Sequence, residues 1–143
     1  MQYDPQVVRP MRDELVRLGA TELLTSEAVD AVLDSDGTVL VVVNSVCGCA
    51  AANARPAVAI ATGHEVQPDR IVTVFAGQEA EATERARSHM PGYRPSSPSI
   101  ALFKDGELVY FVPRHRIESR SAKDVAADLK SAFDRYFAAT PAS

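Results

Sequence analysis

The segment from Thr38 to Pro56, TVLVVVNSVCGCAAANARP, constrains the fold more than any other part of this 143-residue chain. Its first part, Val39 to Val43, is a run of apolar and mostly β-branched residues without polar alternation. Such a run is typical of a strand buried on both faces, inside a parallel sheet that helices cover. Alanines that favour helix follow Cys47 and Cys49. The two cysteines are therefore predicted to lie where a buried strand is followed by a helix.

This position favours reactive cysteines. The first turn of a helix has backbone N–H groups without intrahelical partners and a partial positive charge, and both stabilise a thiolate. The thiolate is the nucleophilic form of cysteine, and an ordinary thiol titrates near about pH 8.5. The alternative interpretation is that both residues are small buried hydrophobes. The chain has no other cysteines, and their grouping at one junction favours the reactive interpretation.

Composition narrows the class of protein. Hydrophobic residues make up 46% of the chain and charged residues 24%, which is typical of one globular domain over residues 1–143. Lys and Arg number 15 against 19 Asp and Glu, so nucleic acid is not expected as a partner. No apolar run approaches the roughly 20 residues of a membrane span, and no signal-peptide pattern opens the chain. We therefore expect a cytoplasmic protein without a membrane partner, in which a cysteine pair is catalytic or metal-binding.

The rest of the chain predicts helices that alternate with strands. Apolar residues spaced three and four apart predict three helices. One covers 5–19, one begins after the capping residue Thr25, and one covers 122–137. A charged segment over 79–89 predicts another helix, and Pro56 is expected to kink the helix after the cysteines. Strands are predicted over 71–75 and 100–103, and Asp105-Gly106 indicates a hairpin that returns over 108–112.

In this order the elements form a βαβ unit followed by a ββα unit. The expected fold is a thioredoxin-like, three-layer α/β/α arrangement, with a four-stranded mixed sheet and an extra N-terminal helical segment. Pro98 stands directly before the third predicted strand and is similar to the cis-proline that faces the active cysteines of thioredoxins. Pro56 resembles the proline that kinks the cysteine helix in that family.

Four motifs, VVVNSVCGCAAANARPA, VTVFAGQ, PSSPSIAL and VPRHRIE, together resemble the bacilliredoxin family over essentially the whole chain. The resemblance implies a thiol-disulfide oxidoreductase that removes bacillithiol from S-bacillithiolated client proteins. Cys47 would then be the attacking cysteine and Cys49 the resolving one. It also implies no tightly bound cofactor, with bacillithiol, a small thiol that carries a malate group, as co-substrate. A general protein disulfide reductase or isomerase is the alternative, because some members of the family were described as weak isomerases.

The cysteine segment departs from that of thioredoxin in three ways. Val46 stands where thioredoxin has a tryptophan, and Val41 to Val43 provide no buried acid to accept a proton from the resolving thiol. Gly48 is a one-residue spacer, and it is expected to supply the backbone freedom that a disulfide across one residue demands. Such a disulfide should be strained and easily reduced.

Other polar residues near the motif are candidates for substrate binding. Pro98 is predicted to be cis and to present the Ser97 backbone to a bound peptide or thiol, or else simply to begin a strand. Asn44 and the neighbouring Ser45 either donate to the thiolate or end the strand. Arg55, together with Asn53, is expected either to bind an anionic thiol or to be an exposed, solvated residue.

One of the three histidines of the chain is also a candidate for substrate binding. His64 and His89 are expected at the surface, and Arg114-His115-Arg116 forms a basic group that binds an anionic substrate or is a solvated turn.

A metal-binding function is the rival to thiol exchange. Two thiolates one residue apart could bind a soft metal such as copper(I), or join a zinc site shared by two copies of the chain. We expect no metal in the thiol-exchange interpretation.

Overall fold

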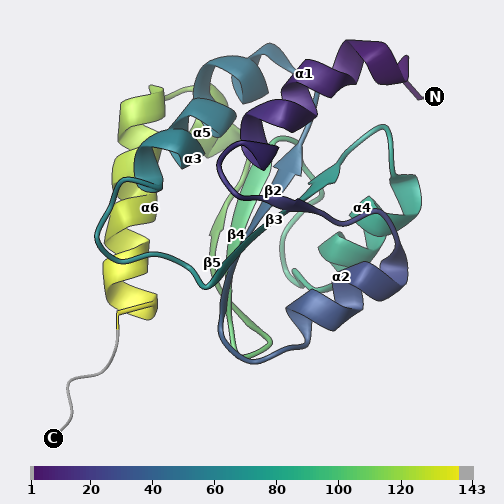
Figure 1. The fold of residues 1–143 in the computed structure, drawn as a ribbon. Helices are drawn as coiled ribbons and strands as arrows, with labels where there is room; N and C mark the ends of the chain where they lie inside the picture. The colour runs from purple at the N-terminus through teal and green to yellow at the C-terminus, as the bar shows by residue number, and fades with distance from the viewer. Residues whose placement is uncertain (1, 139–143) are drawn as a thin grey trace, which may run out of the picture.

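A five-stranded sheet in the order β1-β3-β2-β4-β5 lies at the centre of the computed structural model, which describes residues 2–138 (Figure 1). Parallel pairing joins β3 to both of its neighbours, whereas β4 is antiparallel to β2 and β5 is antiparallel to β4. The strands are β1 (Thr21–Glu22), β2 (Thr38–Asn44), β3 (Arg70–Phe75), β4 (Ser99–Lys104) and β5 (Glu107–Val112).

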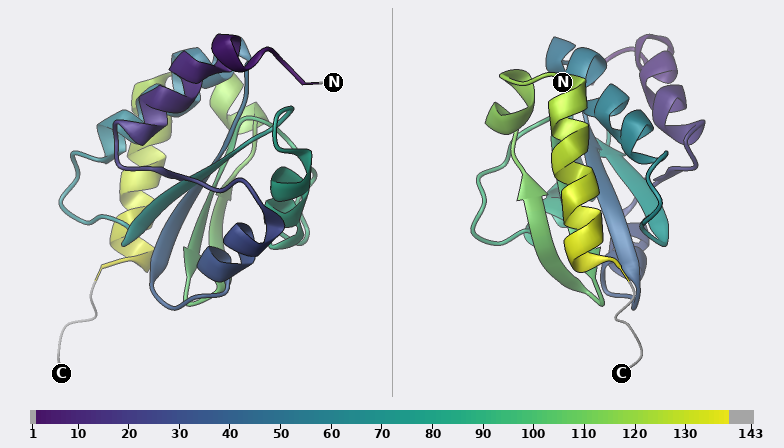
Figure 2. Two further views of the ribbon diagram at one scale, coloured as in Figure 1. Left: turned by 45° about the vertical axis from the view of Figure 1, so that its right-hand side comes forward. Right: turned by 90° about the vertical axis from the view of Figure 1, so that its left-hand side faces the viewer.

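Helices cover both faces of this sheet, which gives the predicted three layers (Figures 1 and 2). One face carries α1 (Pro5–Val16), the π-helical turn η1 (Ala50–Ala54), α3 (Arg55–Ala61), α5 (His115–Glu118) and α6 (Ala122–Tyr136). The other face carries α2 (Ser26–Leu33) and α4 (Ala80–Ser88).

The strand β2 is the centre of the hydrophobic core, and all seven of its residues are buried. Leu40 and Val42 pack against the layer that contains α3 and α6, whereas Val39, Val41 and Val43 pack against α2 and α4. This confirms the prediction of a strand buried on both faces. The cysteine segment therefore leaves the sheet from the end of a fully buried strand.

The prediction of four strands was wrong by one, because β1 adds a fifth at the edge. Its two residues pair with Val72 and Thr73 of β3, and the N–H of Leu23 donates to the carbonyl oxygen of Thr73 at 2.8 Å. A strand of two residues has no alternation that could be read in the sequence. It extends the sheet between α1 and α2 without changing the order of the other strands.

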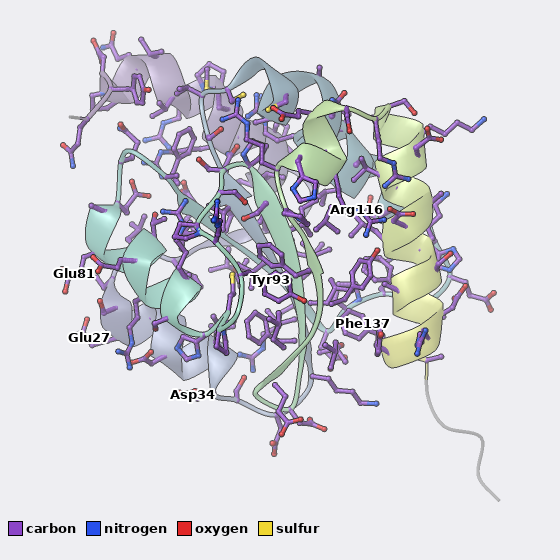
Figure 3. The ribbon with its side chains drawn as sticks, turned by 180° about the vertical axis from the view of Figure 1, so that it is seen from behind. Glu27, Asp34, Glu81, Tyr93, Arg116 and Phe137 are labelled. Carbon is purple, nitrogen blue, oxygen red and sulfur yellow. The ribbon has the colours of Figure 1, made fainter. Side chains whose placement is uncertain are left out.

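The turns and caps follow the local sequence closely. The Oγ1 of Thr25 accepts a hydrogen bond from the N–H of Ala28 and caps α2, as predicted. Asp105 and Gly106 both have positive φ, at 50° and 84°, and form the predicted hairpin turn between β4 and β5. The short helix α5, where a turn was expected, was not predicted. Tyr93, in the loop after α4, lies over this hairpin and stacks on Phe111 with ring centroids 4.4 Å apart (Figure 3).

The helix after the cysteines is irregular, but not in the way that was predicted. The irregularity is the π-helical turn at Ala50–Ala54, and Pro56 is the second residue of the regular helix α3. Because proline has no N–H to donate, it fits the first turn of a helix better than the interior. The irregularity therefore lies directly before Pro56, in a π-helical turn that accommodates one extra residue.

Candidate active site at the end of the central strand

A short polar turn connects β2 to Cys47. The Oδ1 of Asn44 accepts a hydrogen bond from the N–H of Ser45 at 2.9 Å, and the Oγ of Ser45 accepts one from the N–H of Cys47 at 3.1 Å. The carbonyl oxygen of Cys47 accepts hydrogen bonds from the N–H groups of Ala50 and Ala51. These bonds fix Cys47 at the start of the helical segment, as the sequence predicted.

Both cysteines are thiols and both are partly exposed. Their Sγ atoms are 2.6 Å apart, close enough for one thiol to donate a hydrogen bond to the other sulfur. Gly48 between them is not in the left-handed region, and no atom lies within 4 Å of the position that a Cβ would take. The expectation that Gly48 supplies unusual backbone freedom therefore does not apply to this dithiol form.

The two thiols differ in acidity. The hydrogen bond from Cys49 lowers the pKa of Cys47, and the backbone N–H groups of Cys49 and Ala50 and the charge of Arg114 lower it further, against an opposing effect of burial. Burial raises the pKa of Cys49, and so do its hydrogen bond to Cys47 and the negative charge there. Because a thiolate is the reactive form of cysteine, the thiol with the lowered pKa, Cys47, has the larger reactive fraction of the two.

Arg114 lies near both sulfurs from the other side of the site. Its Nε donates to Glu118 at 3.0 Å, and one terminal nitrogen is 3.5 Å from the carbonyl oxygen of Ser97. The Ser97–Pro98 peptide bond is cis, as predicted. The structure thus brings Cys47, Ser97 and Arg114 to the same cavity, whereas His115 does not line it.

This cavity beside Cys47 has a volume of about 400 Å³. It is lined by Tyr3, Ser45, Val46, Cys47, Ala76, Gly77, Arg87, Ser97 and Arg114, with no acidic residue among them. Tyr3, from the segment before α1, and Arg87, from α4, were not predicted as site residues. Neither residue lies in a motif, and only the fold brings them to the cysteines.

The structure contradicts both expectations for Arg55, which were that it binds an anionic thiol or is an exposed, solvated residue. Arg55 is only 3% exposed, and its Nε donates to Oε2 of Glu14 at 2.7 Å. A terminal nitrogen donates to Oδ1 of Asn44 at 2.9 Å and to the carbonyl oxygen of Ser45 at 3.2 Å. Arg55 therefore supports the turn before Cys47 from inside the protein. Arginines are seldom buried unless paired, and its partner Glu14 lies 41 residues away in the sequence.

The two asparagines also have structural partners. Asn44 is 1% exposed, and its Nδ2 donates to the carbonyl oxygen of Met11 at 3.2 Å, so it ends the strand and does not donate to the thiolate. The Nδ2 of Asn53 donates to the carbonyl oxygen of Ile117 at 2.9 Å and ties the π-helical turn to α5. Both amide nitrogens are directed to backbone oxygens and not to the cavity.

None of the three histidines lines the cavity beside Cys47. The side chain of His89 is 13% exposed and lies between Asp30 and Asp34, so it is less exposed than predicted. His64 pairs with Asp134. Among residues 2–138, the three-residue group that could hold a metal ion is Asp30, Asp34 and His89, and no third ligand joins the two thiols. The same described part of the chain contains no helix long and apolar enough to cross a lipid bilayer.

Solved thioredoxin structures share this architecture. The thioredoxin of Malassezia sympodialis superposes with a TM-score of 0.58 at 17% sequence identity, covering 83% of this chain and 91% of that one. A mutant thioredoxin of Halobacterium salinarum gives a TM-score of 0.58 at 23% identity, covering 85% and 94%. At these identities the similarity establishes the fold, and the predicted thioredoxin-like fold is confirmed.

Sequence relatives give a closer match. A bacilliredoxin of Salinibacter ruber is 56% identical over 141 residues, which covers 95% of this chain and 82% of the relative, and one of Staphylococcus aureus is 51% identical, covering 94% and 92%. A family model described as disulphide isomerase matches residues 3–137. Together with the fold and the cysteine pair, these matches define a thiol-disulfide oxidoreductase. The chain belongs to the bacilliredoxin family, as its motifs predicted.

Proposed function

We propose that this protein removes bacillithiol from S-bacillithiolated client proteins, with Cys47 as the attacking cysteine and Cys49 as the resolving one. The observation that carries the proposal is the position of Cys47, which lines the cavity beside Arg114 while Cys49 does not, and the pKa is lowered for Cys47 and raised for Cys49. One cysteine is therefore ready to attack while its neighbour keeps its proton. Bacillithiol serves as the co-substrate, no tightly bound cofactor is needed, and the proposed location is the cytoplasm.

In the first step the Cys47 thiolate attacks the bacillithiol sulfur of the mixed disulfide. The client–bacillithiol S–S bond breaks, and the client sulfur leaves as a thiolate that takes a proton from water. A new S–S bond joins bacillithiol to Cys47. One disulfide is lost and one is formed, so this exchange needs no external reductant.

The second step has two possible routes. In the first, Cys49 attacks the Cys47 sulfur, releases bacillithiol and forms an internal disulfide. In the second, another bacillithiol attacks the sulfur of the bound one, so that bacillithiol disulfide forms and Cys47 leaves as a thiolate. The first route has a built-in trigger. Once Cys47 is in a disulfide, its negative charge no longer raises the pKa of Cys49, whereas the charge of Arg114 still lowers it. Cys49 can then lose its proton without a buried acid beside it.

Ser97 and Pro98 border the substrate. Ser97 lines the same cavity as Cys47, and we propose that its backbone hydrogen-bonds to the bound mixed disulfide, with Pro98 holding the segment at the start of β4. A second candidate function is a general protein disulfide reductase or isomerase, which the description of the matching family model favours. The two functions differ in whether the small thiol is recognised.

A comparison of two mixed disulfides tests the proposal. The reduced protein is incubated with one test client carrying bacillithiol and, in parallel, with the same client carrying glutathione, and release of the client thiol is followed with time. Faster release from the bacillithiolated client is expected, and Cys47→Ser is the inactive control. Equal rates on both clients, together with repair of scrambled disulfides, would instead establish the general reductase or isomerase.

A further inference from the structure

Arg87 is a cationic residue of the cavity that the mechanism above does not use. Its Nε is buried and has no hydrogen-bond partner, and a terminal nitrogen donates to the carbonyl oxygen of Ser96 at 3.3 Å. Within residues 2–138 no carboxylate pairs with it, whereas Arg85 on the same helix α4 pairs with Asp30 at 2.7 Å. Arg87 is therefore a half-buried guanidinium with unused donors.

Leaving such a group unpaired is costly. Burial of a charge is unfavourable unless the charge is paired and hydrogen-bonded. The same burial lowers the pKa of Arg87, although arginine stays protonated in proteins. An anion in the adjoining cavity would place a compensating negative charge beside the guanidinium. The neutral backbone oxygen of Ser96 does not provide a charge.

Arg114 adds a second positive charge to the same cavity. It lies close enough to influence the pKa of both cysteines, and its own partner Glu118 does not line the cavity. The lining thus combines two guanidinium groups and one reactive sulfur, without a carboxylate. A guanidinium presents its donors in a planar fork that matches a carboxylate.

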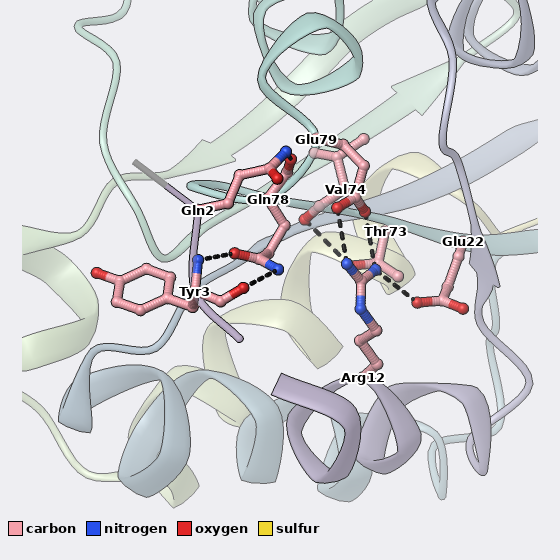
Figure 4. Close-up of polar contacts among 8 residues, drawn as sticks. All are labelled: Gln2, Tyr3, Arg12, Glu22, Thr73, Val74, Gln78 and Glu79. Carbon is pink, nitrogen blue, oxygen red and sulfur yellow. Dashed lines mark hydrogen bonds and ion pairs between the residues drawn. The ribbon is translucent and has the colours of Figure 1, made fainter. Parts of the chain in front are cut away.

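Tyr3 closes the cavity on the side of the N-terminal segment. The N–H of Tyr3 donates to Oε1 of Gln78 at 2.6 Å, and Nε2 of Gln78 donates to the carbonyl oxygen of Tyr3 at 3.1 Å (Figure 4). Nε2 of Gln2 also donates to the carbonyl oxygen of Gln78 at 2.8 Å. This paired segment holds the Tyr3 ring near Gly77, where a Cβ would be 3.2 Å from the ring.

We infer that the cavity binds the small-thiol half of the mixed disulfide when that thiol carries carboxylates, with Arg87 and Arg114 binding the carboxylates and Tyr3 forming the wall. The inference rests on the proposed function and specifies its substrate class. A volume of about 400 Å³ fits a small molecule. With the carboxylates bound in the cavity, the thiol's sulfur is directed at Cys47 while the client remains outside.

Two mixed disulfides of one test peptide separate charge recognition from thiol exchange itself. One carries mercaptosuccinate, a thiol with two carboxylates, and the other carries uncharged 2-mercaptoethanol. Because a hydrogen-bonded charge pair is lost, Arg87→Gln should lower kcat/KM for the mercaptosuccinate disulfide by about tenfold and change the mercaptoethanol disulfide by less than about twofold. Arg87→Lys should recover part of the difference. Arg85→Gln, on the same helix but paired with Asp30, is the matched control and should change neither value.

Three results would overturn the inference. They are an unchanged preference in Arg87→Gln, an equal loss on both disulfides, and no recovery in Arg87→Lys. The proposed function fails separately, when the wild-type protein releases bacillithiol and glutathione at equal rates. Because the mercaptosuccinate comparison uses neither of those thiols, it tests the cavity whatever the outcome for bacillithiol.

Discussion

Arg55 of α3 donates to Glu14 of α1 at 2.7 Å, and through this pair the helix after the cysteines is joined to the N-terminal helix. The other donors of Arg55 hold Asn44 and Ser45 at the end of β2. One buried side chain therefore connects three segments that surround the cysteine turn. Its role is to position the turn, and it does not line the cavity beside Cys47.

Replacing this arginine should destabilise the protein. Arg55→Met keeps most of the side-chain volume but removes every hydrogen bond, so the free energy of unfolding should fall by about 2–4 kcal/mol. Denaturant unfolding measures the change. Arg9→Met on the exposed side of α1 is the control, with an expected change below about 0.5 kcal/mol. Equal stability of the two variants would contradict the structural role of Arg55.

The acidity of Cys47 should appear in the pH dependence of its alkylation. Only the thiolate reacts, and an ordinary thiol is half protonated near about pH 8.5. Because the pKa of Cys47 is lowered, its alkylation should stay fast below that pH. Cys49→Ala removes the largest lowering contribution and should move the midpoint to higher pH. Arg114→Gln should move it the same way by less, and Arg116→Gln, paired with Asp128, is the control. Iodoacetamide labelling with fragment-ion mass spectrometry gives each rate.

The order of attack can be read by trapping the intermediate. Cys47→Ser should abolish release of the client thiol, because the serine hydroxyl is not ionised at neutral pH. Cys49→Ser should leave the first step intact and accumulate bacillithiol on Cys47. Intact-protein and peptide mass spectrometry identify the adduct. An adduct on Cys49 in the Cys47→Ser variant would reverse the two roles.

Two glycines near the site should respond differently to alanine. Gly77 has a φ of +91° and a Cβ there would lie 3.2 Å from Tyr3, so Gly77→Ala should cost about 1–2 kcal/mol of stability. Gly48 has open space around it and an ordinary φ, so Gly48→Ala should leave the stability unchanged within about 1 kcal/mol. Thermal unfolding of both reduced variants tests the contrast. A larger loss for Gly48→Ala would show that the spacer is strained after all.

Features with a local cause were predictable from the sequence. The apolar run at Val39 to Val43 is buried on both faces, Asp105-Gly106 forms the hairpin turn, and the cysteines lie between strand and helix. In each case the deciding interaction involves neighbours in the chain or the simple alternation of apolar residues. The same holds for the cap at Thr25.

Features decided by distant partners were not predictable. Burial of Arg55 depends on Glu14, and the place of Tyr3 beside the cysteines depends on Gln78, 75 residues away. Arg87 enters the cavity because α4 covers one face of the sheet. No spacing in the sequence records these contacts. The edge strand β1 is likewise defined by its pairing with β3, not by a pattern of its own.

The π-helical turn at Ala50–Ala54 sets the angle between the cysteines and Arg55. A turn of this kind contains about one residue more than a regular α-helical turn, and one residue corresponds to a rotation of about 100° around the axis. Shortening this alanine segment by a single residue would turn the guanidinium away from Glu14 or swing both sulfurs away from Arg114. The length of the segment is therefore fixed by orientation, even though four of its five side chains are the methyl groups of alanine.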